Sequence, residues 1–553
     1  MKKKVFALAT VLVMALSLVL TGCGGGTSST GGGTSTGGAS TSGAASTGGG
    51  ASTDDGGGTA GNINVKDEIV VALPQIVAKL DPQYGAAMWE WTVNINIYDT
   101  LWRTPKNDYR NEEQINWMVD DYTVADDNLS WTITLRDDLL FHDGSKFTSE
   151  DAKFSIDRMG TSPYTMASME WVDNVEVVDD LTFIIHMKYT FPLVKQLLAD
   201  YQYAMCSKNA IETYGEGSRE AIVGTGPYKL VEWTADNNIT LEYFEDHFAP
   251  EPAIKKVTYR AIPDYSSAAI AMRSGEVDLM NYGLATDILG FIEDTENFDT
   301  ARIERDHTQG MTFNNQVAPF NDVRIRQAVN HAIDKEAVNL ITDEGLSNTE
   351  NTKVKTFPTM EGYSKALNEG RLTVYEYDVD KAKALLAEAG YDENNPMNVP
   401  YITPSSAFAQ SLAAALQAQL SVVNINLDIE VMEPSAWINR VAEGDFVCGF
   451  NDTGAWGNRS ALSYHWMYHT GAMYAREHAN IARVDEITET GLRTLDAAER
   501  EELYAELLEI VSAEAICVPV MQRVAYIVTV KGLNAYAEPM MLPIAIYDCD
   551  WDA

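Results

Sequence analysis

Apolar and polar residues follow two different patterns after residue 62. Short runs rich in β-branched and aromatic residues predict strands, and they cover 69–73, 131–136, 182–187, 239–243, 257–262, 425–431 and 526–530. Elsewhere apolar residues recur every three or four positions, which predicts helices at 379–389, 408–420 and 498–512. Strands and helices mixed along the whole chain predict an α/β fold.

Capping residues mark several helix boundaries. Asp378 is the expected N-cap of the helix at 379–389, and Gly390 follows its end. Thr148 and Asp151 have the spacing of a capping box and predict another helix. In the segment that starts at Asp322, one helical face carries the apolar side chains of Ile325, Ala328, Val329, Ala332 and Ile333.

The N-terminus has the pattern of an export signal. Lys2, Lys3 and Lys4 precede an apolar run over 5–20 that is too short to span a membrane. The sequence then reads Leu20-Thr21-Gly22-Cys23, which resembles the lipobox of bacterial lipoproteins. That resemblance implies a signal peptide over 1–22, cleavage before Cys23 and a lipid on the Cys23 thiol.

Composition narrows the class of protein further. Residues 24–62 are nearly all Gly, Ser, Thr and Ala, so the segment 23–62 is expected to be a disordered tether with a reach of about 35 Å. The 80 acidic and 40 basic side chains give a net charge of −40, which argues against nucleic acid as a partner. Beyond Cys23, four cysteines match no zinc or redox spacing and leave two disulfides or buried free thiols as alternatives.

Over about residues 66–545, the chain resembles the extracellular solute-binding proteins of the oligopeptide, dipeptide and nickel class. The resemblance lies in the order and spacing of short phrases. They are Leu80-Asp81-Pro82, Tyr98-Asp99-Thr100-Leu101, Trp131-Thr-Ile-Thr-Leu-Arg136, Phe141-His-Asp-Gly144, Phe147-Thr-Ser-Glu-Asp151, Gly224-Thr-Gly-Pro-Tyr-Lys-Leu230, Ser274-Gly-Glu-Val-Asp-Leu279, Asp322-Val-Arg-Ile-Arg-Gln-Ala-Val329, Ala332-Ile-Asp-Lys335 and Tyr377-Asp-Val-Asp-Lys-Ala-Lys-Ala-Leu-Leu-Ala-Glu-Ala-Gly-Tyr391.

The resemblance implies a two-lobed periplasmic-binding-protein fold of type II, cluster C, with an extra subdomain in the first lobe. By analogy, lobe I comprises 66–110, 219–308 and 521–553, the inserted subdomain 111–218, and lobe II 309–520. It further implies a monomeric, lipid-anchored receptor on the extracytoplasmic face, without a cofactor. Closure of the lobes around a peptide-like ligand would deliver that ligand to the permease subunits of an ABC importer.

Three segments are expected to contact the ligand. The first follows the Asp-Pro turn and contains Ala86, Ala87, Met88 and Trp89, and the second is the predicted chain crossing with Gln309 and Asn314. The third resembles the acidic segment that binds the α-ammonium group of peptides in this family. It contains Phe450, Asn451, Asp452, Thr453 and Trp456, although Asp452 is displaced by one position and Phe450 stands where a tryptophan is usual.

Other functions remain open at this level. The same fold could bind a sugar, an opine or a metal chelate, or present its ligand to a signalling partner. A secreted hydrolase acting on carbohydrate would need two paired carboxylates, and the sequence pairs none. His465 and His469 lie four positions apart with His478 beyond, but Trp466, Tyr468 and Tyr474 around them indicate packing, and no metal site is predicted.

Overall fold

The computed structural model describes residues 65–75, 77–85, 88–106, 113–234, 238–283, 288–455, 459–472, 474–537 and 543–552. All of them belong to one compact unit, Ala60–Ala553. The expected signal peptide, Cys23 and tether lie outside the described residues. None of the described helices has the length and apolar character needed to cross a bilayer.

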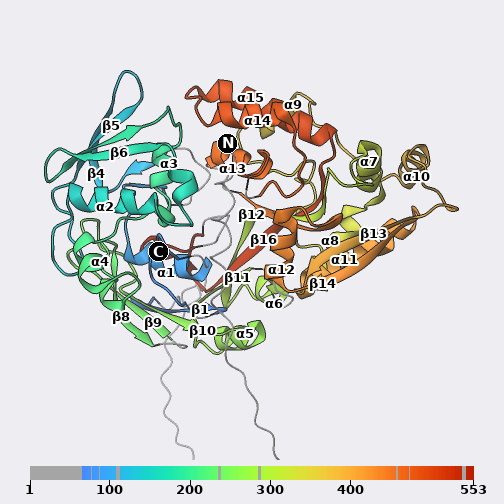
Figure 1. Cartoon of the computed structure of the whole chain (residues 1–553). Helices are drawn as coiled ribbons and strands as arrows, with labels where there is room; N and C mark the ends of the chain where they lie inside the picture. Colours follow the sequence, from blue (N-terminus) through green and yellow to red (C-terminus); the bar gives the residue numbers. More distant parts are fainter. Residues whose placement is uncertain are drawn as a thin grey trace, which may run out of the picture. The chain divides into compact units, whose positions relative to one another are not determined.

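One mixed sheet of ten strands runs through this unit in the order β14-β13-β15-β12-β16-β11-β1-β10-β9-β8 (Figure 1). Its strands are β1 (Glu68–Leu73), β8 (Tyr228–Thr234), β9 (Asn238–Tyr243), β10 (Lys256–Ala261), β11 (Leu279–Gly283), β12 (Phe298–Phe313), β13 (Met397–Pro404), β14 (Ile425–Met432), β15 (Cys448–Gly454) and β16 (Cys517–Val530). The architecture is the two-lobed α/β fold that the sequence predicts.

A second sheet of four antiparallel strands has the order β4-β5-β7-β6 and is formed by residues 119–187. Its strands are β4 (Val119–Val124), β5 (Ser130–Leu135), β6 (Val172–Val177) and β7 (Thr182–Met187). Two short pairs complete the strands, β2 (Trp102–Arg103) with β3 (Ile115–Asn116) and β17 (Leu533–Asn534) with β18 (Asp550–Trp551).

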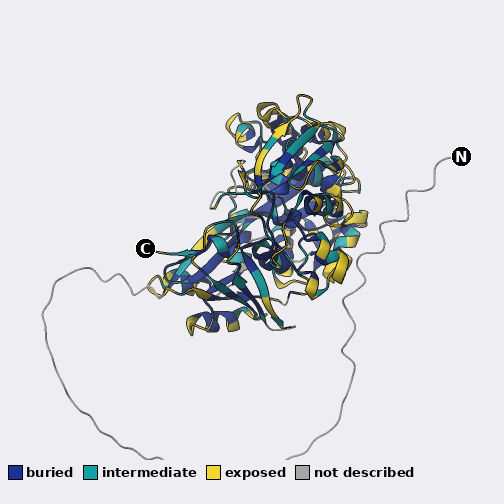
Figure 2. Ribbon diagram, turned by 90° about the vertical axis from the view of Figure 1, so that its left-hand side faces the viewer, coloured by how far each residue is buried: buried dark blue, intermediate teal, exposed yellow. Residues whose placement is uncertain are grey.

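Helices connect and cover the strands. They are α1 (Met88–Ile97), α2 (Ser149–Met159), α3 (Val194–Leu198), α4 (Lys208–Tyr214), α5 (Tyr265–Arg273), α6 (Leu289–Glu293), α7 (Val323–Ala332), α8 (Lys335–Asp343), α9 (Tyr363–Asn368), α10 (Val379–Glu388), α11 (Ala407–Ser421), α12 (Pro434–Glu443), α13 (Ser460–Tyr468), α14 (Ala482–Gly491) and α15 (Ala497–Ala513). Figure 2 shows buried residues in the interior and exposed residues on the outer helices and loops, and outer strands such as β4 are also largely exposed.

The long strands β12 and β16 cross from one half of the large sheet to the other. The first half of β12, Phe298–Glu304, pairs with the second half of β16, which in turn pairs with β11. The second half of β12, His307–Phe313, pairs with β15. The register between β12 and β16 shifts between Glu304 and Thr308, so the crossing point falls at residues 305–307.

A glycine allows these two strands to approach at the crossing. A Cβ atom at Gly310 would lie 2.0 Å from the carbonyl oxygen of Val518 and 2.8 Å from the amide nitrogen of Val520. A second register shift separates Gln309 from Gly310, which lies opposite Pro519. Since proline cannot donate to the ladder, the irregular pairing here follows from the two residue types.

The predicted caps are confirmed. Thr148 begins α2 with a capping box to Asp151, and the side chain of Asp378 accepts from the amide of Lys381 at the start of α10. Asp322 caps α7, but this helix ends at Ala332, and Ile333 is buried in an extended conformation beyond it. Although α7 is amphipathic, the guanidinium of Arg326 is buried, and it donates to the carbonyls of Phe320 and Glu514.

Gly224-Thr-Gly-Pro forms a tightly packed bend before β8. A Cβ atom at Gly224 would lie 1.9 Å from the carbonyl oxygen of Ile97. His142 joins the bend through Nε2, which lies 2.8 Å from the carbonyl oxygen of Gly226. Burial lowers the pKa of His142 to about 4, so the ring is neutral at pH 7 and serves packing.

The four cysteines of the described residues, Cys206, Cys448, Cys517 and Cys549, are buried free thiols.

Candidate ligand-binding site

A polar cluster lies where β12, β15 and β16 meet, next to the crossing point. The antiparallel register places Gln309 directly opposite Asp452. Gln309 Nε2 donates to Asp452 Oδ1 at 3.0 Å, and Arg523 Nη1 donates to Gln309 Oε1 at 2.9 Å. His307 Nε2 lies 3.2 Å from the same carboxylate oxygen. We call Asp452, Gln309, His307, Arg523 and Arg476 the crossing cluster.

Electrostatics keep His307 neutral and Asp452 charged. Burial lowers the pKa of His307 to about 4, and Asp452 opposes this effect while Arg305, Arg476 and Arg523 add to it. Burial alone would raise the pKa of Asp452, but His307, the bond from Gln309 and the two arginines of the cluster hold it below the usual value. At pH 7 the cluster therefore contains one carboxylate and two guanidinium groups.

Aromatic rings support the guanidinium groups. The guanidinium carbon of Arg523 lies 4.5 Å from the centre of the Phe408 ring, and that of Arg476 lies 5.6 Å from Trp437. Arg476 Nη1 also donates to the backbone oxygen of Asp452 at 2.9 Å. Cation–π contacts of this kind fix a cation without neutralising it, so the arginines keep their charge available for a partner.

The position of the cluster in the sheet is the one where ligands bind in open α/β sheets. Strands β13, β14 and β15 are parallel, and they end at Pro404, Met432 and Gly454. Phe408 and Trp437 lie in the first turns of the helices that follow β13 and β14. Ligands of such sheets bind beyond the carboxyl ends of the strands, where the helix N-termini also favour negative charge.

Several predicted site residues have protein partners instead. Asn314 Nδ2 donates to the carbonyl of Gly444 at 2.9 Å. Phe450 is 3% exposed and packs between Phe408 and Trp437. Thr453 Oγ1 donates to Asn451 Oδ1 at 3.0 Å, and both side chains are buried. Their contact with a ligand stays a prediction.

The segment after the Asp-Pro turn leads into α1. Met88 is half-buried at its first position, and Trp89 is 8% exposed and belongs to the hydrophobic core around β1, β9 and β10. Ala86, Ala87 and Trp456 lie outside the described residues. The structure therefore brings Gln309 and Asp452 together, and a place for the α1 segment in the same site stays a prediction.

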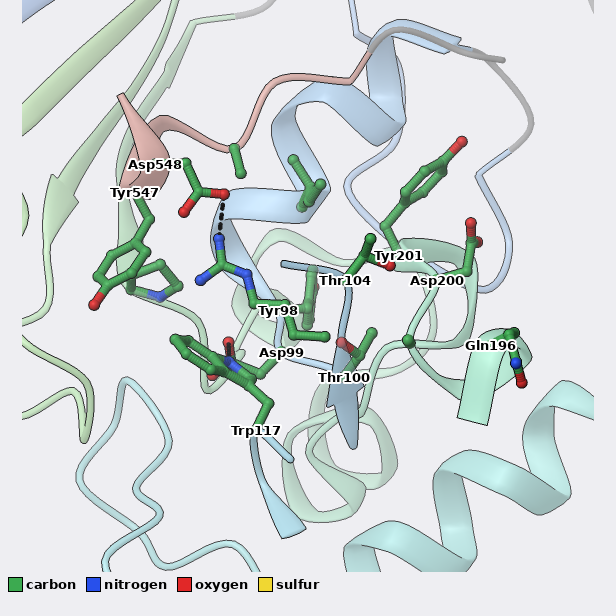
Figure 3. Close-up of a pocket in the computed structure, with 15 residues that line it drawn as sticks. Tyr98, Asp99, Thr100, Thr104, Trp117, Gln196, Asp200, Tyr201, Tyr547 and Asp548 are labelled. Atoms are coloured by element: carbon green, nitrogen blue, oxygen red, sulfur yellow. Dashed lines mark hydrogen bonds and ion pairs between the residues drawn. The ribbon is translucent and has the colours of Figure 1, made fainter. Parts of the chain in front are cut away.

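A separate cavity lies between α1, β2, α3 and the C-terminal segment (Figure 3). Its empty volume is about 820 Å³, solvent at its mouth included. The charged groups that line it have protein partners. Arg103 pairs with Asp548, and Asp99 accepts from Trp117 Nε1 at 2.7 Å. Asp200 pairs with Arg459.

Sequence reasoning missed both arginines of the cluster. Arg523 is the one charged residue within the otherwise apolar and polar-uncharged strand Cys517–Val530, and that pattern was available as a signal. Arg476 carries no comparable signal, because its place beside Asp452 depends on a long-range contact.

Among the described residues, no three His, Cys, Asp or Glu side chains gather as metal ligands. His465 and His469 lie ring to ring at 4.5 Å, and His469 faces Glu489.

Comparison with known proteins decides the class. The family model of the bacterial extracellular solute-binding proteins, family 5, matches residues 113–475, which is more than half of the chain. The chain belongs to this family. It is a substrate-binding protein of ABC import, extracytoplasmic in location, and not an enzyme.

Individual relatives are distant. The glutathione-binding protein GsiB of Pectobacterium atrosepticum is 26% identical over 472 residues, covering 81% of this chain and 87% of the relative. GsiB of Escherichia coli O157:H7 is 25% identical over 476 residues, covering 82% and 88%.

Solved structures confirm the family 5 fold. NikA of Brucella suis, in complex with Fe(III)-EDTA, has a TM-score of 0.77 at 21% identity and covers 88% of this chain and 100% of its own. DppA of Helicobacter pylori, in complex with the peptide STSA, has a TM-score of 0.71 at 23% identity, with coverage of 88% and 98%. Because both sequence identities are below 25%, these structures support the fold of this chain and not its ligand.

Proposed function

We propose that this family 5 protein is a lipid-anchored receptor that binds small peptides by closing two lobes and passes them to an ABC permease. The proposal of a peptide ligand rests on the surroundings of Asp452. Its Oδ1 atom is occupied by Gln309 and His307, its side chain is 34% exposed, and no described residue donates a hydrogen bond to Oδ2. A carboxylate held in this way suits the α-ammonium group of a peptide.

The ligands of similar proteins support a peptide-like ligand. GsiB binds glutathione, a tripeptide, and the aligned region covers more than four fifths of this chain. DppA was solved with a tetrapeptide, whereas the NikA structure holds a metal chelate. Since the crossing cluster combines one carboxylate with arginines, a zwitterionic peptide fits it better than a neutral sugar. The predicted lobe boundaries and the monomeric state are part of this proposal.

Replacing Asp452 by asparagine is expected to weaken binding of short peptides about tenfold or more, because a charge-assisted hydrogen bond contributes roughly 1.5–3 kcal/mol. Isothermal titration calorimetry with glutathione, dialanine and tetraalanine measures the effect. Asp428→Asn is the matched control, since Asp428 is exposed on β14 and should leave affinity unchanged. Unchanged affinity in Asp452→Asn would refute the role of this carboxylate.

The anchor has its own test. Cys23→Ala is expected to abolish incorporation of a labelled fatty acid and to release the protein from the membrane fraction, because the lipid is attached through the thiol. Cys206→Ala is the control, since Cys206 is a buried thiol of the folded unit and should keep the label. Retention of label in Cys23→Ala would contradict the lipobox interpretation.

A further inference from the structure

Three arginines gather near His307 at the crossing point, together with several carboxylates. Arg305, Arg476 and Arg523 act on His307, and so does the carboxylate of Asp452. The chain as a whole has 80 acidic and 40 basic side chains. Asp343 is a second carboxylate that acts on Arg523, and it also accepts from the hydroxyl of Ser347. Within the crossing cluster itself, two guanidinium groups accompany the one carboxylate of Asp452, which favours an anionic group on the ligand.

Arg523 has one side-chain hydrogen-bond partner and one ring contact among the described residues. Its Nη1 donates to Gln309, and its guanidinium lies over the Phe408 ring. Its Nε atom is buried and has no hydrogen-bond partner in the part of the chain that the structure describes. A guanidinium has five N–H donors in a planar fork that matches a carboxylate. A buried donor without a partner is costly, so a ligand oxygen at this position would be strongly favoured.

Gln309 places this guanidinium beside the carboxylate of Asp452. The two ends of one amide group are used, Oε1 for Arg523 and Nε2 for Asp452. The carboxylate of Asp452, which can bind a cation, and the guanidinium of Arg523, which can bind an anion, are thus separated only by the side-chain amide of Gln309. An ammonium and a carboxylate on the same carbon atom could meet both groups together. The amino end of an ordinary peptide offers the ammonium alone, because its α-carboxyl group is part of the first peptide bond.

We propose that Arg523 binds a carboxylate of the ligand beside Asp452, so that the site takes a free α-amino acid head group, as at the glutamyl end of a γ-glutamyl peptide. This inference rests on the proposed function and names its ligand class. Asp452 binds the ammonium and Arg523 the α-carboxylate. Arg476, fixed on the backbone of Asp452, adds positive charge to the same place.

Two isomeric tripeptides separate this inference from general peptide binding. Glutathione and its α-linked isomer have the same atoms and the same net charge, and they differ in whether ammonium and carboxylate share a carbon. Calorimetry should show wild-type protein binding glutathione about ten- to a hundredfold more tightly, which is the factor expected for one charge-assisted hydrogen-bond pair.

Arg523→Gln should remove that preference, because it should lower the affinity for glutathione and leave the affinity for the α-linked isomer unchanged. The retained affinity for the α-linked isomer shows that the variant is folded. Arg302→Gln is the matched control, because Arg302 is an exposed arginine of β12 paired with Glu304. It should keep the preference. Arg523→Lys keeps the charge but loses the fork, so it should recover only part of the preference.

Equal affinity of the wild-type protein for the two isomers would overturn the inference, and so would an equal loss for both in Arg523→Gln. In either case peptide binding itself would stand. Trialanine is the remaining arm. If trialanine binds and glutathione does not, the inference fails and the proposed function holds; if none of the three peptides binds, both fail.

Discussion

Replacing Lys355 by methionine is expected to lower the free energy of unfolding by about 3–5 kcal/mol, because it leaves a buried carboxylate without its cation. Lys355 Nζ lies 2.6 Å from Glu477 Oε2, and the two side chains are 0% and 2% exposed. The pair holds the segment next to Arg476 against the sheet, since the backbone oxygen of Glu477 accepts from Asn315 Nδ2 at 2.8 Å. Urea unfolding monitored by circular dichroism measures the loss.

Two further variants show whether the buried charge is the cause. In Lys355→Met combined with Glu477→Leu, both charges are removed, and most of the lost stability should return. Lys365→Met breaks an exposed pair with Glu369 and should leave the unfolding midpoint unchanged. If Lys355→Met unfolds at the same urea concentration as the wild type, the buried pair does not stabilise this segment.

The second large effect concerns closure, because under the proposed boundaries Asp200 belongs to the subdomain of lobe I and Arg459 belongs to lobe II. Asp200→Asn is expected to weaken ligand binding about a hundredfold, because removing one partner of a buried ion pair costs roughly 3 kcal/mol in the state that buries it. Asp200 follows α3, and its Oδ2 lies 2.8 Å from Nη2 of Arg459, which begins α13. The side chains are 9% and 1% exposed. Calorimetry with a peptide that binds the wild type measures the change.

Asparagine is a close match in shape at this position, so the comparison isolates the charge. Asp200 Oδ1 accepts from the amide of Gln202, and an asparagine oxygen can keep that bond. Burial raises the pKa of Asp200 and Arg459 opposes the rise. Thr190→Val is the control, because Thr190 donates to the backbone oxygen of Arg493 in an exposed contact. An affinity loss as large in Thr190→Val as in Asp200→Asn would contradict a specific role for the ion pair.

Local sequence patterns predicted the secondary structure well where the stabilising interactions join residues close together in the chain. The caps Thr148 and Asp378 form their bonds within three residues of the chain, so spacing alone was sufficient. The strand at 526–530 was predicted too short, because β16 begins at Cys517. Pro519 interrupts the expected pattern of a ladder strand there, and the register shift opposite Gly310 accommodates it.

The site depended on contacts that no local pattern contains. Gln309 and Asp452 are 143 positions apart, and their bond follows from the pairing of β12 with β15. The family's acidic segment identified Asp452 as a candidate and the predicted chain crossing identified Gln309, but the partners Arg523 and Arg476 were not predicted. The family resemblance pointed to the segment that contains Asp452, whereas the arginines around that segment became apparent only in the folded structure.

Native mass spectrometry of the purified protein with a mixture of short peptides tests the central claim most directly. A protein that encloses a peptide without changing it should give a complex of one chain with one peptide, and the peptide released on dissociation should have its original mass. If no peptide adduct forms, or if the released peptide has been cleaved, the account of this chain as a peptide-binding receptor is wrong.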